Sequence, residues 1–97
     1  MVLSHLKALT VAKYSEPISP NSAGDYEYVG LYNGHAYYRR YDKAFYLFYA
    51  TGPGLYWCIT SALGVIPSAY HSNHNTNITA LYYAAGGASG RITVTLI

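Results

Sequence analysis

The chain has 97 residues, which is enough for one domain and too few for two. Hydrophobic residues make up 52% of it and charged residues only 10%, whereas about 25% charged residues is typical. This composition excludes intrinsic disorder. It favours a surface that is partly covered by neighbouring subunits, with a surface kept wet by Tyr and Ser hydroxyls as the alternative. A net charge of +2 is too small for the basic patch of a nucleic-acid-binding protein.

Targeting signals and disulfide bonds are not expected. No stretch approaches the roughly 20 apolar residues that span a bilayer, and residues 1–13 lack the continuous apolar segment and cleavage site of a signal peptide. We therefore expect a soluble protein with no membrane insertion. Cys58 is the single cysteine and lies in an apolar run, which predicts a buried, inert thiol.

Residues 1–24 predict an N-terminal strand followed by a Pro/Ser/Asn loop. The run Leu6–Tyr14 fits the strand, with a helical first turn as the alternative. Pro17 and Pro20 belong to the loop because proline lacks the amide proton that a β-ladder needs. Together with glycine and asparagine, these prolines predict that the loop extends to Gly24.

Residues 25–61 predict a four-strand meander. The strongest signal is Asn33-Gly34 between two tyrosine-rich runs, since a type I′ hairpin turn needs positive φ at both central residues. Gly30 inside the first run indicates a bulge or a close backbone approach. The third run, Ala44–Tyr49, is apolar on both faces and predicts a covered strand, and Leu55–Ser61 completes the meander.

Residues 62–97 predict a loop-rich half that ends in a strand. It comprises a short strand over 68–70, a polar loop over 71–79, an ambiguous segment over 80–83 and a final strand over 91–97. The last run alternates, which predicts one buried face. If it lies at a sheet edge, its unpaired backbone groups are a docking site for another chain.

These elements predict an all-β fold: a small, single-domain, antiparallel meander or sandwich-like sheet. The run lengths exclude a long helix, and the aromatic and β-branched residues fit a pleated sheet. We expect an aromatic core that contains Tyr46, Phe48, Trp57 and Ile59.

The order of short motifs resembles a small Tyr/Gly-rich β module of bacteriophage structural (head- or tail-associated) proteins and of large secreted proteins of environmental bacteria. The motifs are Leu9-Thr10-Val11, Gly30-Leu31-Tyr32-Asn33-Gly34, Phe45-Tyr46-Leu47, Trp57-Cys58-Ile59 and Ala85-Gly86-Gly87-Ala88-Ser89-Gly90. The resemblance covers the chain from about Leu9 to Ile97 and supplies no active site. It implies a virion structural or accessory protein, such as a capsid decoration or a tail-associated subunit, and hence a location in a virion or on an extracellular surface. The start methionine of this chain fits an accessory protein better than a fragment of an adhesin.

Catalysis is not expected from the residues present, and neither is a cofactor. Asp25 and Glu27 could share a strand face, but a small meander offers little cleft between two carboxylates. His71 and His74 are the weak candidates for a metal. Zinc sites use four ligands, so this pair would have to meet its copies around an axis of an oligomer.

The tyrosines are the most informative residues for binding. Tyr37 and Tyr38 must point to opposite faces of a strand, and so must Tyr82 and Tyr83 if they are extended. Exposed tyrosines suit protein interfaces and also stack on sugars. We therefore expect other virion subunits or further copies of the chain as partners, with a host-surface glycan as the alternative. The candidate interface or ligand-binding residues are Tyr28, Tyr32, Tyr37, Tyr38, Arg39, Arg40, Tyr82 and Tyr83.

Overall fold

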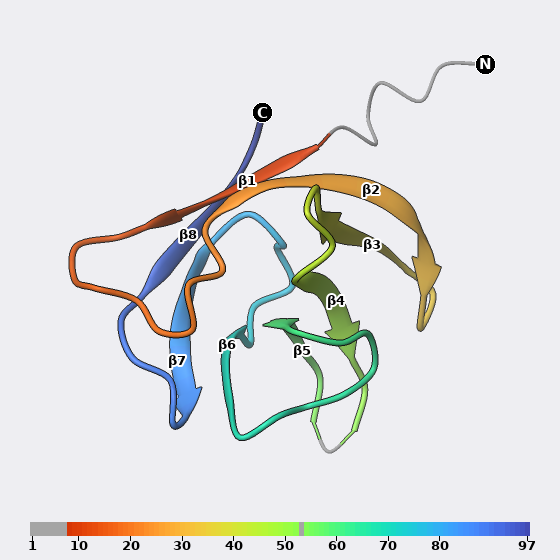
Figure 1. Cartoon of the computed structure of the whole chain (residues 1–97). Helices are drawn as coiled ribbons and strands as arrows, with labels where there is room; N and C mark the ends of the chain where they lie inside the picture. The colour runs from red at the N-terminus through yellow and green to blue at the C-terminus, as the bar shows by residue number, and fades with distance from the viewer. Residues whose placement is uncertain (1–7, 53) are drawn as a thin grey trace.

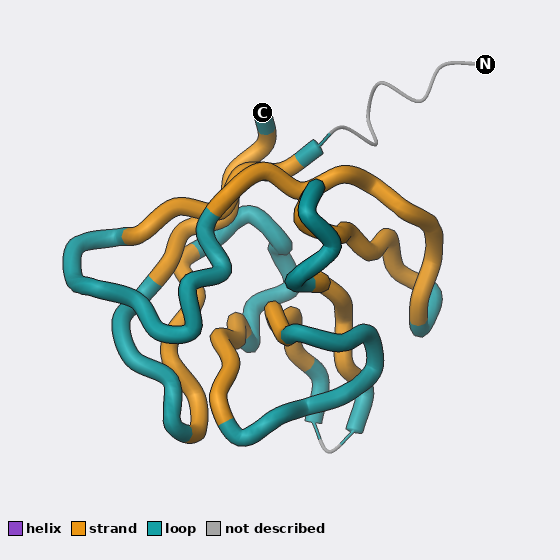
Figure 2. The backbone as a smooth tube through the Cα atoms, in the orientation of Figure 1, coloured by secondary structure: helices purple, strands orange, loops and turns teal. Residues whose placement is uncertain are grey.

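Eight antiparallel strands follow one another around a closed barrel, each paired with its neighbours in the chain (Figures 1 and 2). This computed structural model describes residues 8–52 and 54–97, so Leu6 and Lys7 of the predicted first strand lie outside the described residues. The predicted all-β antiparallel fold is confirmed. The strands are β1 (Leu9–Lys13), β2 (Gly24–Tyr32), β3 (His35–Arg40), β4 (Tyr46–Ala50), β5 (Tyr56–Thr60), β6 (Ala69–Asn73), β7 (Leu81–Gly86) and β8 (Ile92–Leu96).

The barrel closes where the last strand meets the first. β8 pairs with β1 from Leu9↔Leu96 to Lys13↔Ile92, and its other side pairs with β7. The prediction that the C-terminal strand could offer an unpaired edge is therefore wrong, because both of its sides are occupied. Closure of this kind removes the free edge that an open sheet would leave.

The predicted hairpin and bulge are both present in the meander. Asn33 and Gly34 have φ values of 54° and 79°, as a type I′ turn requires. The register of β2 against β3 shifts between Tyr28 and Gly30, which confirms the bulge. One extra residue reverses the inside–outside alternation beyond it. As a result Tyr28 packs on the interior of the barrel and Tyr32 packs on its exterior.

The second half is more regular than its sequence indicates. The predicted loop over 71–79 begins only at residue 74, because β6 continues through Asn73. His71, Ser72 and Asn73 are all buried although they are polar. All three pair with β5, and His71 and Ser72 also pair with β7. The ambiguous segment forms the start of β7.

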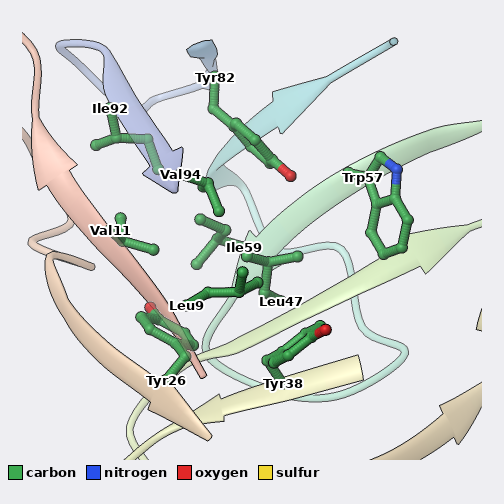
Figure 3. Packing of buried hydrophobic residues seen from close by; sticks show 10 residues of the cluster. All are labelled: Leu9, Val11, Tyr26, Tyr38, Leu47, Trp57, Ile59, Tyr82, Ile92 and Val94. Carbon is green, nitrogen blue, oxygen red and sulfur yellow. The ribbon is translucent and has the colours of Figure 1, made fainter. Parts of the chain in front are cut away.

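Inward-facing residues of the barrel form the inner core (Figure 3). Aliphatic side chains group in its middle, with aromatic rings around them. The hydroxyls of Tyr26 and Tyr82 each donate a hydrogen bond of 2.8 Å to a carbonyl oxygen four residues earlier, so both rings are buried with their polar tips satisfied. The inner core consists of Leu9, Val11, Tyr26, Tyr38, Leu47, Trp57, Ile59, Tyr82, Ile92 and Val94.

A second cluster, the outer cluster, lies on the other face of β4 and β5. It consists of Phe48, Ala50, Tyr56 and Cys58, and Leu63 of the β5–β6 loop packs on it. The predicted aromatic core is thus divided between the two sides of the barrel wall. This explains why β4 is apolar on both faces. None of the described residues forms a helix long and apolar enough to cross a membrane.

Candidate functional site

Two of the predicted contact residues are interior residues. Tyr38 is 6% exposed and Tyr82 is fully buried, both within the inner core. Their assignment as candidate contact residues is therefore corrected. Their neighbours Tyr37 and Tyr83 lie on the outside, which fits the prediction that the two tyrosines of each pair point to opposite faces.

The rings of three further tyrosines pack against other aromatic rings of the same molecule. Tyr28 packs edge-on against Tyr38 with ring centroids 5.9 Å apart. Tyr32 packs edge-on against Tyr37 at 6.3 Å and against Phe48 at 5.5 Å. All three are half-buried. Their main role is therefore to stabilise the β2–β3 hairpin against the barrel.

The two arginines are held in place by ion pairs. Arg39 lies 3.1 Å from Glu27. Arg40 donates two bonds of 2.8 Å to the Asp42 carboxylate and also bonds the carbonyl oxygens of Asn21 and Ala23. The hydrogen bonds from Arg40 lower the pKa of the Asp42 carboxyl. Arg40 therefore ties the loop before β2 to the turn after β3.

Tyr83 is the exposed member of the predicted set, with 56% of its surface accessible. It borders a groove of about 780 Å³ on the outer side of β6 and β7. The polar part of the lining comes from Ser72 and Asn73 at the end of β6 and from His74 and Asn75 of the β6–β7 connection. We call this feature the β6–β7 groove.

Charge is distributed very unevenly over the barrel. No Asp, Glu, Lys or Arg occurs between Ala44 and Gly90, the stretch that forms β4 to β7. The three ion pairs of the described chain lie outside this stretch. We call β4 to β7 with their connections the charge-free half.

Exposed apolar side chains gather near the tip of the β2–β3 hairpin. A small pocket there is lined by Asn33 of the hairpin, by Thr51 and Gly52 of the β4–β5 turn and by Gly64 of the β5–β6 loop, which brings the three connections together. Exposed apolar residues lie within or next to each connection, and one of them, Ile66, lines the pocket itself. These residues, the tip patch, are Leu31 (71% exposed), Leu55 (61%), Val65 (53%) and Ile66 (36%).

The two histidines proposed as weak metal candidates do not face one another. The His71 ring lies inside the barrel wall, with Nε2 3.1 Å from the carbonyl oxygen of Ser89. The His74 ring stacks on Tyr56 of the outer cluster at 5.1 Å. Among residues 8–52 and 54–97, no three His, Cys, Asp or Glu side chains come together as a metal-binding group.

The groups considered for catalysis are separated or occupied. Glu27 pairs with Arg39, and Glu16 pairs with Arg91 at 2.7 Å. Burial raises the pKa of the Cys58 thiol to about 12, so the thiol stays protonated at neutral pH. Its placement in the outer cluster confirms the predicted buried cysteine.

Sequence reasoning missed the tip patch and the β6–β7 groove. The lack of charge between Ala44 and Gly90 was the available signal for the first. No sequence signal was available for the groove, because residues 71–79 resemble an ordinary polar loop. Comparison of the chain with protein-family models, curated proteins and solved structures gives no significant match.

Proposed function

We propose that this protein is a non-enzymatic subunit of a larger assembly, and that the assembly is a bacteriophage particle in which it serves as a capsid decoration or tail-associated protein. The observation that carries the proposal is the tip patch, because its exposed apolar residues adjoin or belong to the charge-free half. The resemblance to phage structural modules supports the particle as the location.

The chemistry of the tip patch favours a protein partner. Interface cores are depleted in charged residues and rich in apolar ones, whereas exposed surfaces that remain in water carry charge. Leu31, near the end of β2, and Leu55, just before β5, are each more than half exposed. Covering such side chains removes apolar surface from water, which is the main favourable term in protein association.

We take a second copy of this chain as the first partner of the tip patch. A patch that is uncharged presents no like-charge repulsion to its own copy, so it is compatible with a two-fold contact. Every strand of the described chain is paired on both sides, so association uses side chains rather than strand addition. Many copies on one particle would make modest individual contacts sufficient.

Light scattering after size exclusion tests the tip patch. We expect the wild-type chain to be an oligomer, and Leu55→Asp combined with Val65→Asp to be a monomer with an unchanged circular dichroism spectrum. Tyr41→Asp is the matched control, since Tyr41 is 58% exposed and lies outside the patch. A wild-type monomer at the highest soluble concentration, or equal dissociation in the control, would contradict the contact.

Mass spectrometry of purified phage particles from the source tests the location. We expect the chain in stoichiometric amounts relative to the major capsid or tail subunits. Its absence from the particles would reject the virion role even if the oligomer forms.

A further inference from the structure

We propose that the β6–β7 groove binds a neutral oligosaccharide, with Tyr83 as the surface on which a sugar ring stacks. The groove volume of about 780 Å³ falls within the range of roughly 300–1,000 Å³ of small-molecule sites. The tip patch and the groove share no residue. The proposal therefore adds a binding activity that does not depend on the assembly contacts.

One wall of the groove is held in a single conformation. Asn73 is 5% exposed, and its side-chain amide donates to the carbonyl oxygen of Asn77 at 2.6 Å. Its side-chain oxygen accepts the backbone amide of Asn75 at 2.8 Å. His74, between them, stacks on Tyr56 of the outer cluster. A wall fixed in this way loses little conformational entropy when a ligand binds.

At the floor of the groove, a flat ligand can reach the aromatic ring of Tyr83. Ala84 and Ala85 of β7 line the groove beside Tyr83, and their small side chains leave the ring uncovered. The ring is fixed to a strand that is hydrogen-bonded to β6 at Ser72↔Tyr83. A rigid aromatic ring with a polar tip is a low-entropy contact surface, and its face accepts the C–H groups of a pyranose.

The polar groups of the groove suit hydroxyls rather than ions. The exposed Asn75 amide supplies both a donor and an acceptor, and its side chain has no hydrogen bond to the described residues. No lining residue is an Asp, Glu, Lys or Arg. A charged sugar would find no counter-charge in the groove, so its chemistry selects neutral sugars.

The surface next to the groove extends the stacking platform. The pairing of Tyr82 with Ile92 brings Tyr83 beside Arg91, the residue that precedes β8. The Arg91 guanidinium lies 4.9 Å from the ring centre of Tyr14, and Glu16 balances its charge. Tyr14 is 54% exposed, so two accessible tyrosine rings lie along one face. This arrangement favours an oligosaccharide over a single sugar as the ligand.

The probe is an array of neutral oligosaccharides of glucose, mannose, galactose and N-acetylglucosamine, with sialylated and sulfated glycans for comparison. We expect binding to at least one neutral series and weaker binding to the anionic ones. Titration calorimetry with the best array ligand should then show at least about fivefold weaker binding for Tyr83→Ala, since aromatic contacts of this kind are worth about 1 kcal/mol.

Tyr41→Ala is the matched control, because it removes another exposed tyrosine far from the groove residues in the chain. Asn75→Ala keeps the backbone bond to Asn73 and should also weaken binding. Binding to no neutral glycan, or equal affinity of Tyr83→Ala and wild type, overturns the proposal. Because Tyr83 lies outside the tip patch, its substitution should leave the oligomeric state unchanged. A failure of the glycan-binding proposal can therefore be distinguished from a failure of the assembly proposal.

Discussion

At the scale of single residues, several turns depend on one glycine with an unusual backbone conformation. Gly86, at the end of β7, has a φ of 61°, and a Cβ built there would collide with the carbonyl oxygen of Ser68. The Gly87 amide donates a hydrogen bond of 2.7 Å to the same oxygen, and this bond keeps the Gly86–Gly87 backbone close to Ser68. Gly34 has a similar φ of 79°, but nothing lies within 4 Å of its Cβ position.

Alanine substitutions at these two glycines separate the cost of backbone strain from the cost of a steric clash at Cβ. We expect Gly34→Ala to lower the free energy of unfolding by about 1 kcal/mol, the cost of a left-handed conformation. Gly86→Ala should cost about 2–4 kcal/mol, because the overlap with Ser68 is added. Urea denaturation of the two variants measures both values. Equal destabilisation would show that the close approach at Gly86 contributes nothing.

The placement of single side chains followed from the sequence only in part. The opposite orientations of Tyr37 and Tyr38 were predicted correctly, because alternation is a local property of any strand. Which of the two points inward was not predictable. That choice depends on the curvature of the sheet and on the bulge at Gly30, which changes the alternation along β2.

At the scale of elements, an ion pair joins the segment after β1 to the start of β8. Arg91 donates to both carboxylate oxygens of Glu16, at 2.7 and 3.3 Å. The hydrogen bond from Arg91 lowers the pKa of Glu16 from 4.5 to about 2. The folded state therefore binds a proton at Glu16 less readily than the unfolded state does.

The pH dependence of stability follows from this shift. The stabilising contribution of Glu16 is fully present above its unfolded pKa of 4.5, and it is lost as the pH falls towards 2. We expect the difference in unfolding free energy between wild type and Glu16→Gln to shrink over this window. Urea denaturation at several pH values measures this difference. Arg91→Gln should flatten the dependence of the unfolding free energy on pH in the same way as Glu16→Gln. An unchanged slope in Glu16→Gln contradicts the assignment.

β6 shows why one element was mistaken for a loop. Its sequence ends in His71, Ser72 and Asn73, which carry polar groups that usually face water. In the barrel, the His71 ring and the Asn73 amide have partners from the 86–90 turn and from the β6–β7 connection. Those partners are distant in the chain or depend on the loop conformation, so no local pattern reports them.

At the scale of the whole molecule, closure makes every strand depend on both of its neighbours. β8 pairs with β1 and β7, so the first and last strands close the barrel. Trp57 is the single tryptophan and lies in the inner core on β5, far from β8 in the chain. Its fluorescence therefore reports on a strand that does not pair with β8.

Cooperative unfolding is the expected consequence. Val94→Ala removes an inner-core side chain of β8 that is 1% exposed, and should cost about 2 kcal/mol. Leu96→Ala on the same strand is the control: its side chain is 59% exposed, and its cost should stay below about 0.5 kcal/mol. In Val94→Ala, the midpoints from Trp57 fluorescence and from circular dichroism should fall together. A shift in only one signal would contradict two-state behaviour.

The sequence alone determined the all-β class, the hairpin at Asn33-Gly34, the irregularity at Gly30 and the burial of Cys58. These features depend on local backbone preference or on neighbouring apolar residues. Only the tertiary structure decided that the sheet closes, that the aromatic core divides into two clusters and that Tyr83 borders a groove. Each of these depends on residues far apart in the chain meeting, as β1 and β8 do, and no local pattern encodes such a meeting.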